Sequence, residues 1–232
     1  MSIDALKQAL PDYAKDIRLN LSSLATDPSL GAPQRAGCFI ATALAVGNAV
    51  ATRELVDAFA GDLSPEQLTA AKGAAAIMAM NNVYYRTTHM LANTEYKQFQ
   101  SKLRMNILAS HGIDKTDFEL WSLAVSAVNA CGMCLDAHER KVRAAGLTAE
   151  QVQTAIRIAA VVHAVGAVLD GEAALADTPA AAAAAGMASH AVSRNSARNS
   201  MFTAAISTSA RSAMRSASVV AGVFMARSIA SK

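Results

Sequence analysis

The stretch Ser64-Pro65-Glu66-Gln67 decides how this chain folds. A serine at the N-cap, a proline at the first helical position and a glutamine three residues after the serine form a capping box, which predicts the start of a helix. An alanine-rich helix follows, from Leu68 to about Thr88. The stretch Thr148-Ala149-Glu150-Gln151 repeats the signature and predicts a last core helix that runs to about Asp170. Two helix starts of one kind favour a helical protein.

Helix signals recur elsewhere, and strand signals do not. The pattern predicts a long helical stretch from about Gln34 to Phe59 and a helix from Phe118 to Asn129 that Thr116 or Asp117 caps. Gly146 is expected to end the helix before the Thr148 signature. We therefore predict an all-α fold.

A faint internal repeat refines this prediction. Residues 78–89 align with residues 127–138, which places Asn82, Tyr85 and His89 at the positions of Cys131, Cys134 and His138. Two related helical hairpins, one reactive and one chemically blank, would explain the alignment. Coincidence between alanine-rich segments explains it equally well.

Charge divides the 232-residue chain into two parts. Residues 1–177 hold all 18 acidic residues and 15 of the 21 lysines and arginines, whereas residues 178–232 hold six basic residues and no acidic one. We predict a helical domain over 1–177 and a basic, Ala/Ser/Arg-rich extension over 178–232. The extension is either weakly ordered or a cationic amphipathic helix for an acidic membrane or a partner. Because the positive charge belongs to the extension alone, the overall charge of +3 gives no reason to expect a nucleic-acid partner.

The N-terminus and the hydropathy indicate a cytoplasmic protein. Residues 1–7 show no basic region followed by an apolar core, so no secretory signal is expected. No uninterrupted run of 18 apolar residues exists, so no membrane-spanning helix is expected either. In the cytoplasm the resting state of neighbouring cysteines is the dithiol.

Cys131 and Cys134 carry the clearest chemical signal in the chain. Thiols three positions apart on a helix can open and close a disulfide without moving the fold, and His138 follows on the same face. Three interpretations stay open at this point: a redox dithiol, a zinc site, or two inert core thiols. Zinc needs a fourth ligand, and no second CxxC motif or histidine pair supplies it, while Cys38 stands alone in a different segment. We therefore predict no bound metal.

A redox thiol reacts as its thiolate, so the site must lower a thiol pKa. Amide groups at the start of the cysteine helix and the imidazole of His138 are local candidates for that effect. Glu119 precedes Cys131 by twelve residues and would relay protons if its helix packs against the cysteine helix. The alternative is that Glu119 is an ordinary acidic residue that favours a helix N-terminus.

Taken together, these segments resemble a known family. The run Phe118 to Cys131, continued through Cys134-Leu135-Asp136-Ala137-His138-Glu139, is similar to alkyl hydroperoxidase D, within the carboxymuconolactone decarboxylase-like superfamily. Leu10 to Ile17 and Ala75 to Arg86 extend the resemblance, which covers roughly residues 1–175. It implies an all-helical subunit, usually a homotrimer, with weak peroxidase activity and no bound cofactor.

The resemblance also implies partners and roles. The family reduces the peroxiredoxin alkyl hydroperoxidase C, with electrons from dihydrolipoamide groups on a dihydrolipoamide acyltransferase that dihydrolipoamide dehydrogenase reduces. Carried over to this chain, Cys134 becomes the sulfenic acid, Cys131 donates a proton and closes the disulfide, and Glu119 and His138 relay protons. Met133 departs from the pattern, because the best-known members have histidine there, and the extension has no counterpart.

The sequence thus predicts an antioxidant thiol peroxidase and disulfide reductase. One rival is a cofactor-free decarboxylase of the same superfamily with His138 as its base, which would not need two cysteines. The other rival is a non-enzymatic redox sensor in which the Cys131–Cys134 disulfide switches binding of the basic extension.

Overall fold

The fold is seen in a computed structural model that describes residues 3–176 and residue 178. These residues form eight α-helices, four short 3₁₀ helices and no strand, which confirms the predicted all-α class. The α-helices are α1 (Asp4–Ala9), α2 (Lys15–Ala25), α3 (Ala32–Val46), α4 (Ala49–Phe59), α5 (Pro65–Met90), α6 (Lys115–Val128), α7 (Gly132–Ala144) and α8 (Ala149–Ala176). The 3₁₀ helices are η1 (Asp12–Ala14), η2 (Ala60–Asp62), η3 (Thr94–Lys97) and η4 (Asn106–Leu108).

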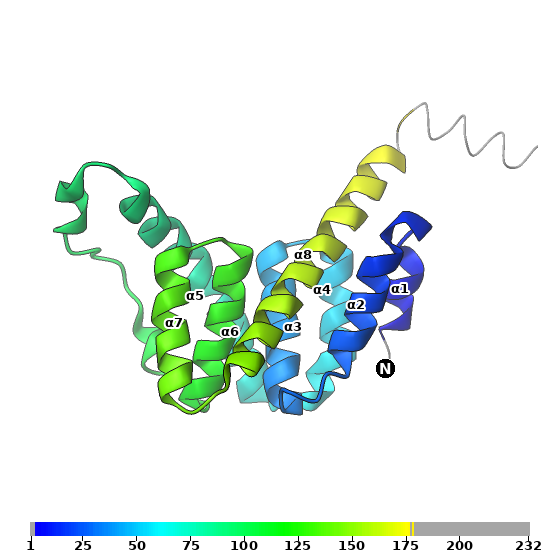
Figure 1. The fold of residues 1–232 in the computed structure, drawn as a ribbon, viewed down its shortest axis with the longest axis horizontal. Helices are drawn as coiled ribbons and strands as arrows, with labels where there is room; N and C mark the ends of the chain where they lie inside the picture. Colours follow the sequence, from blue (N-terminus) through cyan, green and yellow to red (C-terminus); the bar gives the residue numbers. More distant parts are fainter. Residues whose placement is uncertain (1–2, 177, 179–232) are drawn as a thin grey trace, which may run out of the picture. The chain divides into compact units, whose positions relative to one another are not determined.

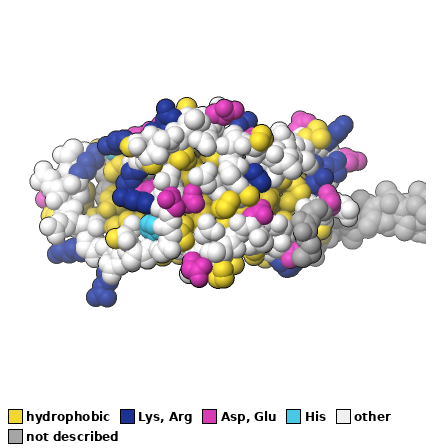
Figure 2. Space-filling view, turned by 90° about the horizontal axis from the view of Figure 1, so that it is seen from below, with side chains coloured by type: hydrophobic (Ala, Val, Ile, Leu, Met, Phe, Trp, Pro, Cys, Tyr) yellow, Lys and Arg dark blue, Asp and Glu magenta, His cyan; other side chains and the backbone are white. Residues whose placement is uncertain are grey.

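The compact unit of the chain ends at Ala173. The predicted extension lies outside the described residues except for residue 178, so the domain boundary at 177 and the two interpretations of the extension stay predictions. The face of the protein in Figure 2 mixes acidic, basic and apolar side chains and does not gather charge of one sign.

The centre of the compact unit is the contact between α3 and α6, which lie side by side in Figure 1. The indole of Trp121 on α6 is fully buried, and its Nε1 donates a hydrogen bond to the carbonyl of Gln34 at 3.1 Å. Gly37 on α3 makes room for this ring, because a Cβ atom at residue 37 would lie 1.9 Å from Trp121 Cε2. The two helices can approach this closely only because one of them lacks a side chain there.

Both capping boxes form as the sequence predicts. Ser64 Oγ accepts a hydrogen bond from the Gln67 amide at 3.2 Å, and Gln67 Oε1 accepts one from the Ser64 amide at 2.9 Å. Thr148 and Gln151 make the same reciprocal pair at 3.2 and 2.8 Å. The capped helices α5 and α8 are the two longest of those described, and α8 continues six residues beyond the predicted end, from Asp170 to Ala176.

Two local predictions are wrong. The stretch from Gln34 to Phe59 is broken at Gly47, whose φ of 82° lies in the left-handed region, and Asn48 then caps a new helix by accepting a hydrogen bond from the Ala51 amide. A glycine with positive φ followed by an asparagine N-cap is a strong helix break. The cap of α6 is Asp114, whose carboxylate accepts hydrogen bonds from the amides of Thr116 and Asp117, the two residues predicted as caps.

An internal repeat is present, but its register differs from the predicted one. Residues 78–89 lie within the unbroken helix α5, whereas residues 127–138 cross the break between α6 and α7. The corresponding units are instead α3-α4-α5 and α6-α7-α8: 83 residues separate Ala32 from Lys115 and Ala49 from Gly132. The capping serine and threonine, Ser64 and Thr148, are 84 residues apart.

Burial follows the new register. Along α7 and its N-cap, residues 131, 134, 138 and 142 are buried, and along α4 and its N-cap the buried residues are 48, 51, 55 and 59. The first copy therefore has Ala36, Asn48, Ala51 and Leu55 where the second has Glu119, Cys131, Cys134 and His138. At these positions the second unit carries the reactive side chains, and the first carries none of them.

Helix α8 needs a separate remark, because by length and composition it could cross a membrane, although the sequence predicts no span. In this structure 56% of its most apolar window is buried within the protein, and Val162, Val165 and Leu169 belong to the core. The core helix of a soluble protein can have the same length and apolar composition, so α8 is weak evidence for a membrane span.

The contact between α3 and α6 gives the first testable prediction. Gly37→Ala places a methyl group in the Trp121 ring, so we expect the free energy of unfolding to fall by about 1–3 kcal/mol in urea denaturation. Gly171→Ala in α8 is the matched control, because open space surrounds residue 171 and alanine favours a helix by up to about 1 kcal/mol. Equal stabilities of the two variants would contradict the packing described.

Candidate active site

The turn between α6 and α7 presents the two cysteines. Ala130 has a φ of 52°, a left-handed conformation uncommon outside glycine, and the Cys131 amide donates a hydrogen bond back to the Ser126 carbonyl at 3.1 Å. Cys131 is the N-cap of α7, so Cys134 lies in its first turn. Both cysteines thus belong to the N-terminal turn of a helix, where the helix dipole favours negative charge. A thiolate at either position is stabilised by this placement.

The cysteine pair is within disulfide-bonding distance, with Cα atoms 5.3 Å apart. The two residues differ in their surroundings, because Cys131 is fully buried whereas Cys134 retains 6% exposure and lines a pocket. A small molecule in the pocket therefore meets Cys134 and not Cys131.

Glu119 and His138, predicted from the sequence as partners of the cysteines, lie against each other. Glu119 on α6 and His138 on α7 are both buried, and Glu119 Oε2 is 2.5 Å from His138 Nδ1. The other carboxylate oxygen, Oε1, accepts a hydrogen bond from Lys141 Nζ at 2.7 Å. Glu119 is therefore a buried partner of α7 and not a surface residue at the start of a helix.

The charge of Glu119 is determined by these contacts. Burial acts to raise the pKa of the carboxyl group, but the hydrogen bonds from His138 and Lys141 outweigh burial and hold the pKa below its usual range. The carboxylate is therefore ionised near neutral pH. An ionised acceptor at Nδ1 orients the imidazole ring.

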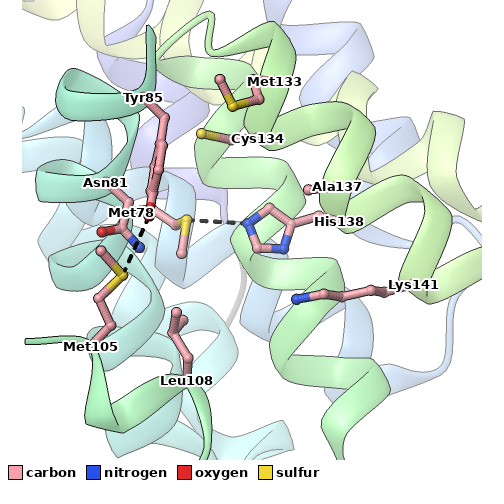
Figure 3. Close-up of a pocket in the computed structure, with 10 residues that line it drawn as sticks. All are labelled: Met78, Asn81, Tyr85, Met105, Leu108, Met133, Cys134, Ala137, His138 and Lys141. Atoms are coloured by element: carbon pink, nitrogen blue, oxygen red, sulfur yellow. Dashed lines mark hydrogen bonds between the residues drawn. The ribbon is translucent and has the colours of Figure 1, made fainter. Parts of the chain in front are cut away.

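Met78 holds the other side of the imidazole ring. Its Sδ lies 3.3 Å from His138 Nε2, and the contact is drawn as a dashed line in Figure 3. Met78 comes from α5, so residues of α5, α6 and α7 together fix one imidazole ring.

The pocket has a volume of about 230 Å³ and lies between α5, α7 and the segment after η3 (Figure 3). Its wall is mainly apolar and rich in methionine, with a few polar groups. The lining residues are Met78, Asn81, Tyr85, Met105, Leu108, Met133, Cys134, Ala137, His138 and Lys141. An apolar pocket with a few convergent polar groups beside a reactive side chain is typical of a small-molecule site.

Helix α5 also clamps the turn that carries the cysteines. The fully buried Asn82 donates from Nδ2 to Ser126 Oγ at 3.0 Å, and its Oδ1 accepts from Asn129 Nδ2 at 3.0 Å. The Arg86 guanidinium donates to the Asn129 carbonyl. The sequence alignment made residue 82 a chemically blank counterpart of Cys131, whereas in space Asn82 supports the turn before it.

Three of the clamping and charge-pairing residues had weak signals in the sequence. Lys141 lies three residues after His138 and so shares its helical face. Asn82 and Arg86 are four residues apart near the end of an alanine-rich helix, where polar side chains on one face suggest a partner. The pairing across 44 residues between Asn82 and Ser126 has no local signal.

Cys38 and Met133 complete the picture of the sulfur-containing residues singled out in the sequence. Cys38 is fully buried, and burial, with a smaller effect of the Asp117 carboxylate, raises the pKa of its thiol well above the usual range. It therefore stays a neutral core thiol. Met133 lines the pocket with 37% exposure. Within the described part of the chain no group of three or more His, Cys, Asp or Glu side chains is placed to hold a metal ion.

Comparison with known proteins places the chain among relatives of one kind. Residues 94–177 match the carboxymuconolactone decarboxylase family. A protein of Gluconacetobacter diazotrophicus named alkyl hydroperoxide reductase AhpD is 59% identical over 181 residues, which are 78% of this chain and 99% of the relative. Proteins of the same name from Hyphomonas neptunium and Streptomyces coelicolor are 57% and 54% identical, over 78% and 76% of this chain and 100% and 99% of their own lengths.

The depressed pKa of Glu119 gives a prediction for acid stability. Because the folded-state pKa lies below the ordinary value of 4.5, the carboxylate stabilises the fold above that value, and the contribution is lost as the pH falls through the folded pKa. Glu119→Gln removes it, so the gap in unfolding free energy between wild type and variant should narrow as the pH falls below 4.5 and through the lower folded-state pKa. Glu150→Gln at an exposed position of α8 is the control. A gap that stays constant over this range would contradict the assigned contacts.

Proposed function

The chain belongs to the alkyl hydroperoxide reductase AhpD family, within the carboxymuconolactone decarboxylase family, and from this membership we propose that it reduces alkyl hydroperoxides with Cys131 and Cys134. One observation carries the proposal. Of two cysteines in bonding distance, Cys134 alone lines an apolar pocket, and it shares that pocket with an imidazole held by an ionised carboxylate.

The first step forms a sulfenic acid. The Cys134 thiolate attacks the terminal oxygen of a hydroperoxide ROOH, an S–O bond forms as the O–O bond breaks, and the alkoxide leaves as ROH after taking a proton. The helix N-terminus stabilises the thiolate, and His138, held by Glu119, takes the thiol proton. Its place four residues after Cys134 on one buried face of α7 supports this role.

The next two steps form the Cys131–Cys134 disulfide and then reduce it to the dithiol. The Cys131 thiol attacks the Cys134 sulfenic acid, the disulfide forms and one water leaves. Dihydrolipoamide then reduces the disulfide by two thiol exchanges and is itself oxidised to lipoamide. When the peroxiredoxin alkyl hydroperoxidase C is the substrate, the reduced pair attacks the partner's disulfide through a mixed disulfide instead.

The family resemblance supports a wider setting for the proposed activity. The electron donor is the lipoyl group of a dihydrolipoamide acyltransferase, which dihydrolipoamide dehydrogenase reduces, so the chain needs no bound cofactor. The protein acts in the cytoplasm, where reducing conditions keep the dithiol available. The subunits assemble as a homotrimer.

The two rival functions, a decarboxylase and a redox sensor, predict different experimental results. A decarboxylase that uses His138 as its base keeps its activity after alkylation of the thiols, whereas the proposed peroxidase loses it. A redox sensor shows reduction-dependent binding through residues 178–232 without lipoyl-dependent turnover. The pairing of Cys134 with a pocket favours the peroxidase over both.

The cysteine roles are tested by single substitutions. Cys134→Ser should abolish peroxide consumption, whereas Cys131→Ser should consume one equivalent and stop at a sulfenic acid that dimedone traps, as mass spectrometry would show. Cys38→Ala is the matched control and should retain turnover, because the Cys38 thiol is buried and neutral. Consumption of organic peroxide by Cys134→Ser at the wild-type rate would contradict the role of Cys134 as the peroxide-reactive cysteine.

The electron donor is tested by NADH oxidation. A mixture of NADH, dihydrolipoamide dehydrogenase, lipoamide, this protein and an alkyl hydroperoxide should oxidise NADH, and addition of the peroxiredoxin should increase the rate. Omission of lipoamide should return the rate to background. A rate independent of lipoamide would show that another reductant serves the disulfide.

A further inference from the structure

Asn81 is a buried polar residue without a partner on the wall of the pocket. The residue is 4% exposed, and its Oδ1 has no hydrogen-bond partner among the described residues. It follows Met78 by three positions and precedes Tyr85 by four, so the three side chains share one face of α5. Figure 3 shows this face across the pocket from Cys134 and His138.

The neighbouring residue Asn82 is also buried, but its side-chain amide has hydrogen-bond partners. Asn82 uses Nδ2 and Oδ1 in hydrogen bonds to Ser126 and Asn129, and these bonds hold the α6–α7 turn. An unpaired buried polar atom instead costs about 1–3 kcal/mol of stability. Asn81 differs from Asn82 because no protein group satisfies its Oδ1, and it differs from Ser122, which also has an unpaired buried oxygen, because Asn81 lines the pocket.

The chemistry of the amide matches the reacting group of a hydroperoxide. A side-chain amide offers N–H donors, and at Asn81 these are the polar atoms that can meet a ligand, because Oδ1 is fully buried. The –O–O–H group offers two oxygens that accept hydrogen bonds. Most of the remaining pocket wall is aliphatic, aromatic or thioether, and Lys141 is already paired with Glu119.

We propose that Asn81 is a substrate-binding residue whose side-chain N–H donates a hydrogen bond to the –OOH group of an alkyl hydroperoxide and holds its terminal oxygen toward the Cys134 sulfur. This inference rests on the proposed peroxidase function and adds the group that recognises the substrate. As the O–O bond breaks, negative charge develops on the oxygen bonded to carbon, and an amide N–H aimed at that oxygen stabilises the leaving alkoxide.

The same argument separates the two halves of the catalytic cycle. A dithiol donor carries no –OOH group, and thiols are weak hydrogen-bond partners. Asn81 therefore serves oxidation of the protein by peroxide and not reduction of its disulfide. A merely structural asparagine would affect both halves together.

The test uses Asn81→Leu, which keeps a similar volume and removes the amide. Stopped-flow measurement of the reduced full-length protein with cumene hydroperoxide should show a second-order rate constant about 10- to 30-fold below wild type, the loss of one or two ordinary hydrogen bonds. The rate of disulfide reduction by dihydrolipoamide should stay within about twofold of wild type, since that reaction makes no use of the amide. The melting temperature should be equal to wild type or higher, because an unpaired polar group has been replaced by an apolar one.

Ser122→Ala is the matched control. Ser122 also has a buried, unpaired side-chain oxygen, but it does not line the pocket. This variant should react with peroxide at the wild-type rate. An Asn81→Leu protein that reacts with peroxide as fast as wild type, or that loses both half-reactions together with its melting temperature, would overturn the inference.

A binding measurement separates this inference from the proposed function. In full-length Cys134→Ser protein, which cannot turn over, the ¹⁵N-labelled side-chain amide of Asn81 should shift on titration with cumene hydroperoxide. If the Asn81 amide shifts but the wild-type protein consumes no peroxide, the binding site is supported and the peroxidase function is excluded. Absence of a shift in a protein whose wild type does consume peroxide would overturn the role of Asn81 alone.

Discussion

The buried amide of Asn82 connects the three helices on which the site depends. It comes from α5, donates to Ser126 at the end of α6 and accepts from Asn129 in the turn before α7. Because the turn passes through a left-handed alanine at residue 130, its conformation is unfavourable in isolation and needs such external support. With the turn fixed, Cys131 becomes the N-cap of α7, and the position of every reactive side chain on α7 follows from the helical repeat.

The repeated units show that the scaffold and the chemistry are separable. Helices α3-α4-α5 and α6-α7-α8 have similar lengths and the same order of breaks and buried positions, yet the first unit has Ala36, Ala51 and Leu55 where the second buries a carboxylate, a thiol and an imidazole. Apolar residues at these positions are cheap to bury, whereas polar ones require partners. The second unit supplies those partners within itself and from α5: His138 and Lys141 for Glu119, and Met78 for His138.

The sequence predicted those features that local chemistry determines. The capping boxes at Ser64 and Thr148, the helical class and the cysteine–histidine spacing are visible over three to eight residues of chain. The break at Gly47 was missed because a single glycine is tolerated inside a helix and its left-handed conformation shows only in the fold. Lys141, Met78 and Asn82 acquired roles through contacts between helices, and pairing across 22 to 60 residues of sequence carries no periodic signal.

The burial of Glu119 also determines how the site communicates with solvent. Its two oxygens contact groups of opposite exposure, the buried His138 and Lys141, whose side chain is 52% exposed. An isolated carboxylate at this depth would become neutral, because burial disfavours its charge. Paired with two nitrogen donors, it stays ionised and joins the imidazole to the protein surface through continuous hydrogen bonds. Lys141 itself lines the pocket, so the ionised carboxylate links the buried imidazole to a partly exposed cation at the same pocket as Cys134.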